Sequence, residues 1–280
     1  MVRDLSDLRL CSINTATLGF QAPIRDVIEA VARAGFGHIA PWRREIEGDD
    51  VAEIARHIRD AGLGVSGYCR STYIPAVTRP QFMDNIEANK KAIADAGVLG
   101  AANFVMVVGS LPEGSKDLAS ARSQVQDASA LLAEFGKSVG VRIALEPLHP
   151  VYAADRSCLT LLSEASDICE AIDDPWLGVL IDVYHCWWDP YLEREIIRAG
   201  AARRIFGFHV CDWLRNTQDV LNDRGMMGDG VIDIRGIRRM LEAAEYSGPV
   251  ECEIFSAANW WKRPMDETLL VCAERFTTVA

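Results

Sequence analysis

The stretch that decides the fold is residues 141–147, which read VRIALEP. It is a short apolar run that closes on a carboxylate. The same form returns three times later in the chain, in GVLIDVYH (178–185), IFGFHVCDW (205–213) and PVECEIFS (249–256). Short apolar runs of this kind predict buried strands. The polar residues that close the four runs are Glu146, Asp182, His209 and Glu253. Burying such groups costs free energy unless something compensates it, so their recurrence indicates one shared site.

Outward from these runs, strand-like and helix-like segments alternate along the chain. The predicted strands cover residues 8–15, 37–42, 64–70, 103–109, 141–147, 177–185, 205–213 and 249–256. The predicted helices cover residues 23–34, 51–61, 84–96, 118–139, 159–172, 191–199, 234–244 and 266–276. Glycine follows many of these helices, as at Gly97 and Gly140, where a left-handed residue would lead into the next strand.

Eight strand–helix units in 280 residues, with no long linker, predict an α/β fold. The specific expectation is a single (β/α)8 TIM barrel that spans residues 1–280. A doubly wound sheet is the alternative. It would favour a glycine-rich phosphate turn after the first strand, and INTATLGFQAP (13–23) is not such a turn.

Composition narrows the class of protein. The net charge is −11 and no basic cluster stands out, which argues against a nucleic-acid partner. No apolar stretch approaches the roughly 20 residues of a membrane span. The N-terminus lacks the apolar core of a signal peptide, so we expect a cytoplasmic protein. None of the 8 cysteines forms a C-x-x-C pair, which leaves a zinc ribbon or redox motif unsupported.

The barrel prediction gives the four polar residues a common location. Barrel enzymes place their chemistry at the C-terminal ends of the strands. Strand alternation puts Glu146 and Glu253 on the side that faces the barrel axis. Glu251 shares this parity one layer deeper and competes with Glu253 as the ligand. Glu253 is preferred because it lies nearer the C-terminal end of the strand, and Glu251 could instead pair with Arg142. Three carboxylates and one imidazole suit one hard or borderline divalent cation.

Such a cation would polarise a substrate carbonyl and the neighbouring hydroxyl, which acidifies the C–H bond that they share. Glu146 and Glu253 would then remove and return the proton. This arrangement serves aldose–ketose isomerisation, epimerisation beside a carbonyl, or β-elimination of water.

The motifs EPLHP, IDVYH, FHVCDW with the later GDG, and VECEIFS resemble the xylose-isomerase-like TIM-barrel superfamily, in particular its sugar phosphate isomerase/epimerase group. The resemblance implies one divalent ion (manganese, magnesium, cobalt or zinc) bound by Glu146, Asp182, His209 and Glu253. It implies that the two glutamates are the acid/base pair of an isomerase or epimerase that works through a metal-stabilised enediolate. It also implies a dimer or tetramer.

The resemblance assigns substrate contacts to His185, three residues after Asp182, and to Arg215, six residues after His209. Ketohexose 3-epimerases carry a second glutamate where Tyr152 stands, so the chain departs from that activity. Endonuclease IV has additional histidines that this chain lacks, which disfavours a DNA-repair role.

Further candidates lie at the predicted mouth. His149 is a candidate substrate contact or a loop-packing residue, and Arg224 could meet a phosphate or carboxylate or pair with Asp223 on the surface. Several tryptophans, Trp188 among them, either form a wall that stacks on a polyol or pack at an interface. They are Trp42, Trp187, Trp188, Trp213, Trp260 and Trp261.

Two other functions compete with a metal-dependent sugar isomerase or epimerase. A dehydratase of the inosose or dehydroshikimate kind would use the same site, with His149 or His185 as the acid that assists loss of water. A non-catalytic sugar-binding barrel would bind its ligand without a metal.

Overall fold

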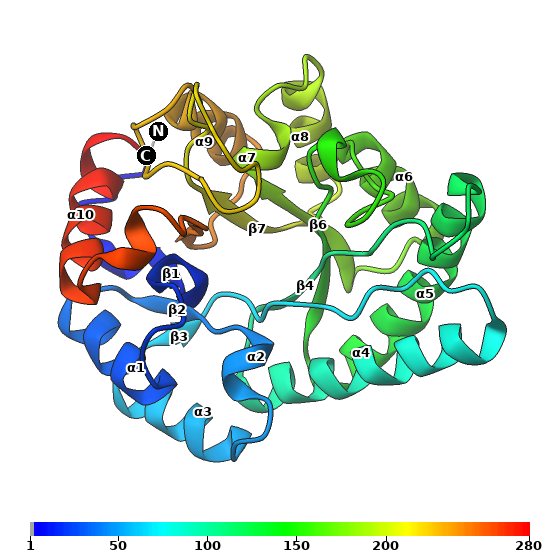
Figure 1. Ribbon diagram of the computed structural model, residues 1–280, viewed down its shortest axis with the longest axis horizontal. Coiled ribbons are helices and arrows are strands. Elements are labelled where there is room, and N and C mark those ends of the chain that lie inside the picture. Colours follow the sequence, from blue (N-terminus) through cyan, green and yellow to red (C-terminus); the bar gives the residue numbers. More distant parts are fainter. Residues whose placement is uncertain (1–2) are drawn as a thin grey trace.

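A computed structural model describes residues 3–280 and shows eight parallel strands surrounded by helices (Figure 1). The strands are β1 Cys11–Asn14, β2 His38–Ala40, β3 Gly64–Val65, β4 Asn103–Met106, β5 Arg142–Leu145, β6 Leu177–Asp182, β7 Ile205–Val210 and β8 Val250–Cys252. They follow the order β3-β2-β1-β8-β7-β6-β5-β4. Isolated parallel bridges, Val65 to Ala101 and Tyr68 to Phe104, join the two edges of this sheet. The predicted TIM barrel is therefore confirmed.

Eight helices follow the eight strands in turn and cover the outside of the barrel (Figure 1). They are α1 Ile24–Arg33, α3 Val51–Asp60, α4 Arg79–Leu99, α5 Leu118–Val139, α6 Leu162–Ile172, α8 Leu192–Ala201, α9 Ile234–Ala243 and α10 Met265–Thr278. Two four-residue helices, α2 Arg43–Ile46 and α7 Val183–Cys186, follow β2 and β6 and were not predicted. No helix among residues 3–280 is both long and apolar enough to cross a membrane.

Helix α4 differs most from its predicted range. It begins five residues earlier, because the Thr78 side chain accepts a hydrogen bond from the Gln81 N–H and Pro80 fits the first turn. It also continues past Gly97 and ends at Gly100, whose φ of +73° suits a left-handed cap. Gly97 serves close packing instead, since a Cβ there would lie 3.1 Å from the Val139 carbonyl oxygen.

The strands separate two apolar regions. The main core lies between the strands and the helices and includes Ile143 and Leu145. A smaller cluster contains Cys69, Val105, Ala144, Leu180 and Phe206. The side chains of β5 thus alternate as predicted, with Ala144 on the side opposite Ile143 and Leu145.

Candidate functional site

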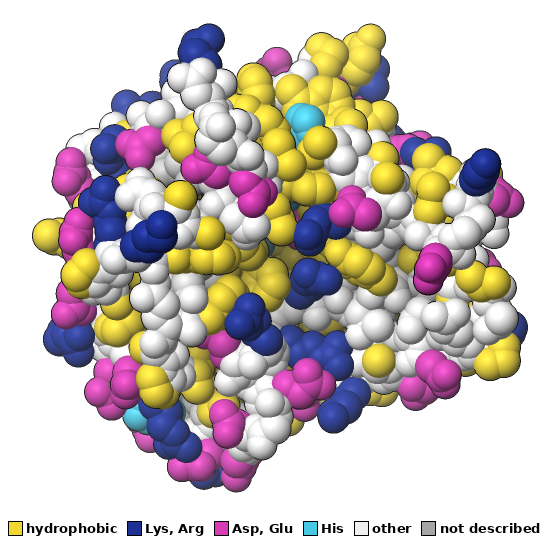
Figure 2. Space-filling view, in the orientation of Figure 1, with side chains coloured by type: hydrophobic (Ala, Val, Ile, Leu, Met, Phe, Trp, Pro, Cys, Tyr) yellow, Lys and Arg dark blue, Asp and Glu magenta, His cyan; other side chains and the backbone are white. Residues whose placement is uncertain are grey.

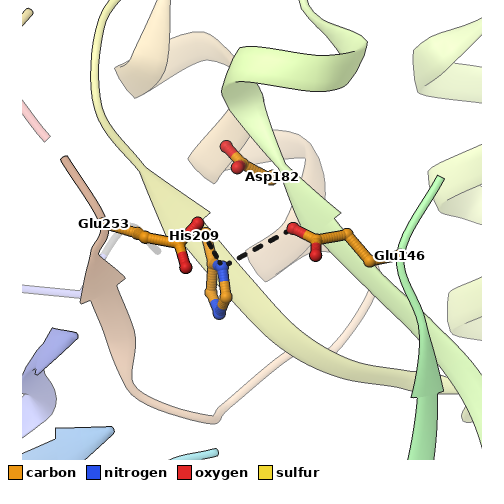
Figure 3. A group of neighbouring side chains, drawn as sticks. All are labelled: Glu146, Asp182, His209 and Glu253. Carbon is orange, nitrogen blue, oxygen red and sulfur yellow. Dashed lines mark ion pairs between the residues drawn. The ribbon is translucent and has the colours of Figure 1, made fainter. Parts of the chain in front are cut away.

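The four polar residues that close the sequence runs converge at the C-terminal ends of β5 to β8 (Figure 3). Asp182 is the last residue of β6 and pairs in register with His209 on β7. Glu146 directly follows β5 and Glu253 directly follows β8. Each residue offers one ligand atom, and these atoms lie within 4.8 Å of one another. All four residues are buried.

The centre of this cluster contains polar atoms that have no hydrogen-bond partner among the described residues. They are Glu146 Oε1 and His209 Nδ1. His209 Nδ1 lies 3.8 Å from Glu146 Oε1 and 3.5 Å from Glu253 Oε2, which is too long for good hydrogen bonds. Unsatisfied buried polar atoms are costly, and a divalent cation between them would satisfy both. Three carboxylates and one imidazole are also a suitable donor set, so the residues fit a metal ion.

A second polar layer beneath the cluster fixes the orientation of His209. Its Nε2 lies 3.0 Å from Glu251 Oε1. Glu251 also accepts hydrogen bonds from Asn14 Nδ2 at 2.8 Å and from Ser66 Oγ at 2.6 Å. The Nε2–H group of His209 thus donates to Glu251, and Nδ1 faces the carboxylates of Glu146 and Glu253.

The predicted pairing of Glu251 with Arg142 is wrong. Arg142 is exposed, and its guanidinium lies 4.8 Å from the centre of the Phe206 ring. Glu251 instead contacts Asn14 on β1, Ser66 just after β3 and His209 on β7.

Burial and crowding shift the acidity of these groups. Burial, reinforced by the Glu253 carboxylate, raises the pKa of Glu146 to about 8. Burial also raises the pKa of Asp182, although the guanidinium of Arg224 opposes the shift. Burial lowers the pKa of His209, but the carboxylates of Glu251 and Glu253 outweigh it and raise that pKa well above its ordinary value.

Arg224 is a buried cation beside the four-residue cluster. Its Nη1 lies 3.0 Å from Asp182 Oδ2 and 3.3 Å from Glu253 Oε2, and its Nη2 lies 3.3 Å from His185 Nε2. Its guanidinium also lies over the rings of Tyr184 and Phe255, at 4.4 and 4.8 Å from their centres. Arg224 is therefore a buried part of the site and forms no surface pair with Asp223.

A cavity of about 300 Å³ opens above the cluster. Glu146, Glu253, His185 and Arg224 line its floor, and aromatic rings form much of its wall. The rings belong to Phe20, Trp42, Tyr73, Tyr152, Phe255 and Trp261. An apolar wall above a polar floor suits a polyhydroxy compound, because sugar C–H faces pack on rings while hydroxyls meet polar groups.

Comparison with known proteins identifies the family to which a barrel with this cluster belongs. Residues 28–271 match the family described as xylose isomerase-like TIM barrel. The chain belongs to this family. The structure of protein SMc04130 from Sinorhizobium meliloti 1021 shares this fold with a TM-score of 0.95 and 45% sequence identity, over 98% of this chain and 99% of that one.

Two curated proteins are also similar to this xylose isomerase-like chain. One is a "Probable ketose 3-epimerase" from Synechocystis, 26% identical over 48% of this chain and 42% of that protein. The other is an "Inosose isomerase" from Halalkalibacterium halodurans, 28% identical over 52% of this chain and 53% of that protein. The matches therefore span about half the length of each curated relative.

In this xylose isomerase-like barrel, not every predicted substrate contact reaches the cavity. His185 and Arg224 do. Arg215 is exposed on the loop after β7 and is not among the residues that line the cavity. The His149 ring packs against Trp213 and Trp188, with ring centres 4.9 and 5.6 Å apart, and lies beside the cavity. The loop is thus folded so that its second arginine enters the site.

Asp212 holds this loop and was not predicted. Its carboxylate accepts hydrogen bonds from the backbone N–H groups of Gly228 and Gly230, both at 2.9 Å, and of Ile232 at 3.0 Å. A side chain at Gly230 would collide with Asp212. The signal was the Asp of CDW combined with GDG, whose glycines let the backbone approach the carboxylate closely.

Asn14 is the second residue that sequence reasoning missed. Its Nδ2 donates to both Glu251 and Glu253, and its Oδ1 accepts from Trp42 Nε1 at 2.7 Å. It thus links the lower layer, a candidate ligand and the aromatic wall. A neutral amide in a strand gives no pattern that would mark it in the sequence.

Proposed function

We propose that this protein is a divalent-metal-dependent isomerase or epimerase that acts on a sugar or a related polyhydroxy carbonyl compound. The supporting observation is the placement of Glu146 and Glu253. Their carboxylates lie on two sides of the unpaired Nδ1 of His209, beneath one cavity. The curated relatives, named "Probable ketose 3-epimerase" and "Inosose isomerase", agree with this class of reaction.

Glu146, Asp182, His209 and Glu253 would hold the ion. A divalent ion bound there would draw electron density from a carbonyl and an adjacent hydroxyl, and so make the intervening C–H more acidic. Manganese, magnesium, cobalt and zinc are the candidates for oxygen-rich coordination of this kind.

The chain's own groups would carry out the proton transfer. One of the two glutamates takes the proton from the activated carbon, and the other returns it on the opposite face or at the neighbouring carbon. Arg224 holds Asp182 and Glu253 in place and faces His185 across the floor. The aromatic wall limits access of water to the reacting carbon.

Proton NMR in heavy water tests the proposal. The metal-loaded protein is incubated with a panel of ketoses, inososes and hydroxy-keto acids. An isomerase or epimerase incorporates deuterium at the carbon beside the carbonyl without losing water. We expect Glu146→Gln and Glu253→Gln each to abolish this exchange, whereas Glu134→Gln on the exposed face of α5 retains it.

The same spectra identify the competing functions. An unsaturated or deoxy product would assign a dehydratase. Ligand binding that persists after chelation, with no turnover of any compound, would assign a sugar-binding barrel. Near-normal exchange in both glutamine variants would refute the acid/base assignment.

A further inference from the structure

The ionised side chains that line the cavity above the two glutamates are all arginines. We infer that the substrate is an anion, namely a polyhydroxy carbonyl compound that carries a carboxylate or phosphate group away from its reacting carbon. This inference rests on the proposed function and specifies its substrate class. The arginines concerned are Arg44, Arg70 and Arg156, which we call the rim arginines.

The floor of the site balances its own charges without the rim arginines. Glu146, Asp182 and Glu253 carry three negative charges, and a divalent ion together with Arg224 would supply three positive ones. Glu251 lies one layer deeper and has donors of its own in His209, Asn14 and Ser66. Apart from Glu251, whose hydrogen-bond donors lie below the cavity, the floor therefore provides no counter-charge for the rim arginines.

Each rim arginine rests on an aromatic ring that also lines the cavity. The guanidinium carbon of Arg44 lies 4.1 Å from the centre of the Phe20 ring, and that of Arg70 lies 4.8 Å from the Tyr73 ring. Arg156 lies 5.7 Å from the Tyr152 ring. A guanidinium on a ring keeps its N–H groups free for a bidentate oxyanion.

The rim arginines lack the carboxylate partners that Arg224 has. Within residues 3–280, neither Arg44 nor Arg70 has a carboxylate oxygen within 4.0 Å. Arg156 has one long contact, 3.8 Å from its Nε to the adjacent Asp155. These cations are thus available to a ligand, whereas Arg224 is already paired with Asp182 and Glu253.

The positive charge of this lining contrasts with the negative net charge of the whole chain. The chain carries a net charge of −11, yet Lys and Arg side chains border the central hollow of the face in Figure 2. A local positive region on an acidic protein attracts small anions and disfavours cations. A neutral sugar would leave the rim arginines without a partner of opposite charge.

Calorimetry with non-reacting ligands provides the first test. The metal-loaded protein is titrated with a hexitol, its 6-phosphate and the hexonate of equal carbon number. We expect the phosphate or the hexonate to bind at least about tenfold more tightly than the hexitol, consistent with one charge-assisted hydrogen-bonded pair. Whichever of the two charged ligands binds more tightly shows whether the cavity prefers a phosphate or a carboxylate group. Equal binding of the hexitol would overturn the inference.

Variants separate the rim arginines from the metal, which also attracts anions. In Arg70→Met and Arg156→Met, the preference for the charged ligand should fall by about tenfold in each. Arg59→Met, on the exposed face of α3, is the matched control and should keep the preference. A preference that survives when Arg44, Arg70 and Arg156 are all replaced by methionine would mean that the metal alone holds the anion, and the inference would fail.

The heavy-water exchange assay distinguishes this failure from failure of the proposed function. A neutral ketose that exchanges as fast as its phosphate and its carboxylate would overturn the anionic substrate and leave the isomerase intact. Loss of exchange with every compound would remove the isomerase, while the calorimetry would still decide whether the cavity selects anions.

Discussion

The two halves of the barrel contribute different chemistry to the same mouth. Strands β5 to β8 supply the charged groups Glu146, Asp182, His209 and Glu253. To this cluster the first half contributes neutral support, namely Asn14 at the end of β1 and Ser66 just after β3, whereas its rim arginines Arg44 and Arg70 line the cavity above. Under the proposed function, one half would hold the ion while the other would help to hold its ligands in place.

This comparison predicts a graded response to mutation. A change in the charged half removes a ligand or its partner, so the effect on metal binding should be large. A change in the neutral half only loosens the orientation of a ligand that remains, so the effect should be smaller. The predictions below run from the largest expected effect to the smallest.

Asp182→Asn should cause the greatest loss. It replaces an anionic ligand with a neutral one and also removes the partner of Arg224. We expect affinity for Co²⁺ to fall by about 1,000-fold or more, since a ligand and a buried charge pair are lost together. Titration by the visible absorption of bound Co²⁺ measures it. Asp127→Asn on the exposed face of α5 serves as the control, and an unchanged affinity in Asp182→Asn would remove Asp182 from the ligand set.

Arg224→Met should reduce kcat/KM by about 100-fold, because it leaves Asp182 and Glu253 without the cation that neutralises them. The thermal midpoint of the metal-free protein should fall as well, and added metal should restore part of it. Arg215→Met, on the exposed part of the same loop, is the matched comparison. Equal losses in the two variants would contradict the distinction drawn between these arginines.

Glu251→Gln tests the layer beneath the site. The amide keeps the shape of the side chain but weakens the hydrogen bond from His209 Nε2. Second-layer changes of this kind cost about 10- to 100-fold in metal affinity. Ser66→Ala, which removes one donor to Glu251, should cost less. The order of the two Co²⁺ affinities is the measurement, and a larger loss in Ser66→Ala would reverse the proposed hierarchy.

The mildest perturbation is a change of pH, which alters no side chain of the protein. Because the pKa of Glu146 is raised to about 8 when no metal is bound, the carboxyl holds a proton at neutral pH and must lose it to bind an ion. Metal affinity should therefore fall as the pH drops below about 8, by about tenfold per unit for the Glu146 proton, and more steeply where His209, whose pKa is also raised, must lose a proton as well. Mn²⁺ dissociation constants from pH 6 to 9 measure the slope. A flat profile would show that Glu146 does not gain the proton.

The charged residues of the site could be predicted from the sequence, whereas the neutral residues that support them could not. Glu146 and Glu253 interrupt apolar runs, and such an interruption stands out because it costs free energy. Asn14 and Ser66 lie among residues of ordinary strand composition, so their role depends on contacts with Glu251, which is far away in the sequence.

The fold was predicted well, but the loop after β7 was not. Choosing between Arg215 and Arg224 requires knowing where that loop turns back. Arg224 enters the site because its backbone N–H donates to the Phe255 carbonyl at 2.8 Å, a pairing across the chain that no local pattern encodes. His185 similarly lies in α7, because the Asp182 side chain accepts from the Tyr184 N–H and ends the strand early.

The single carboxylate of Asp212 has a consequence for how this barrel can diversify. It binds the backbone at the beginning of the loop, at Trp213, and near its end, at Gly228, Gly230 and Ile232. The Asp212 carboxylate thus holds the two ends of the intervening segment together. Apart from Arg224, which pairs with Asp182 and Glu253, residues between the clamp points are the natural targets for changing substrate preference while the candidate metal ligands keep their positions.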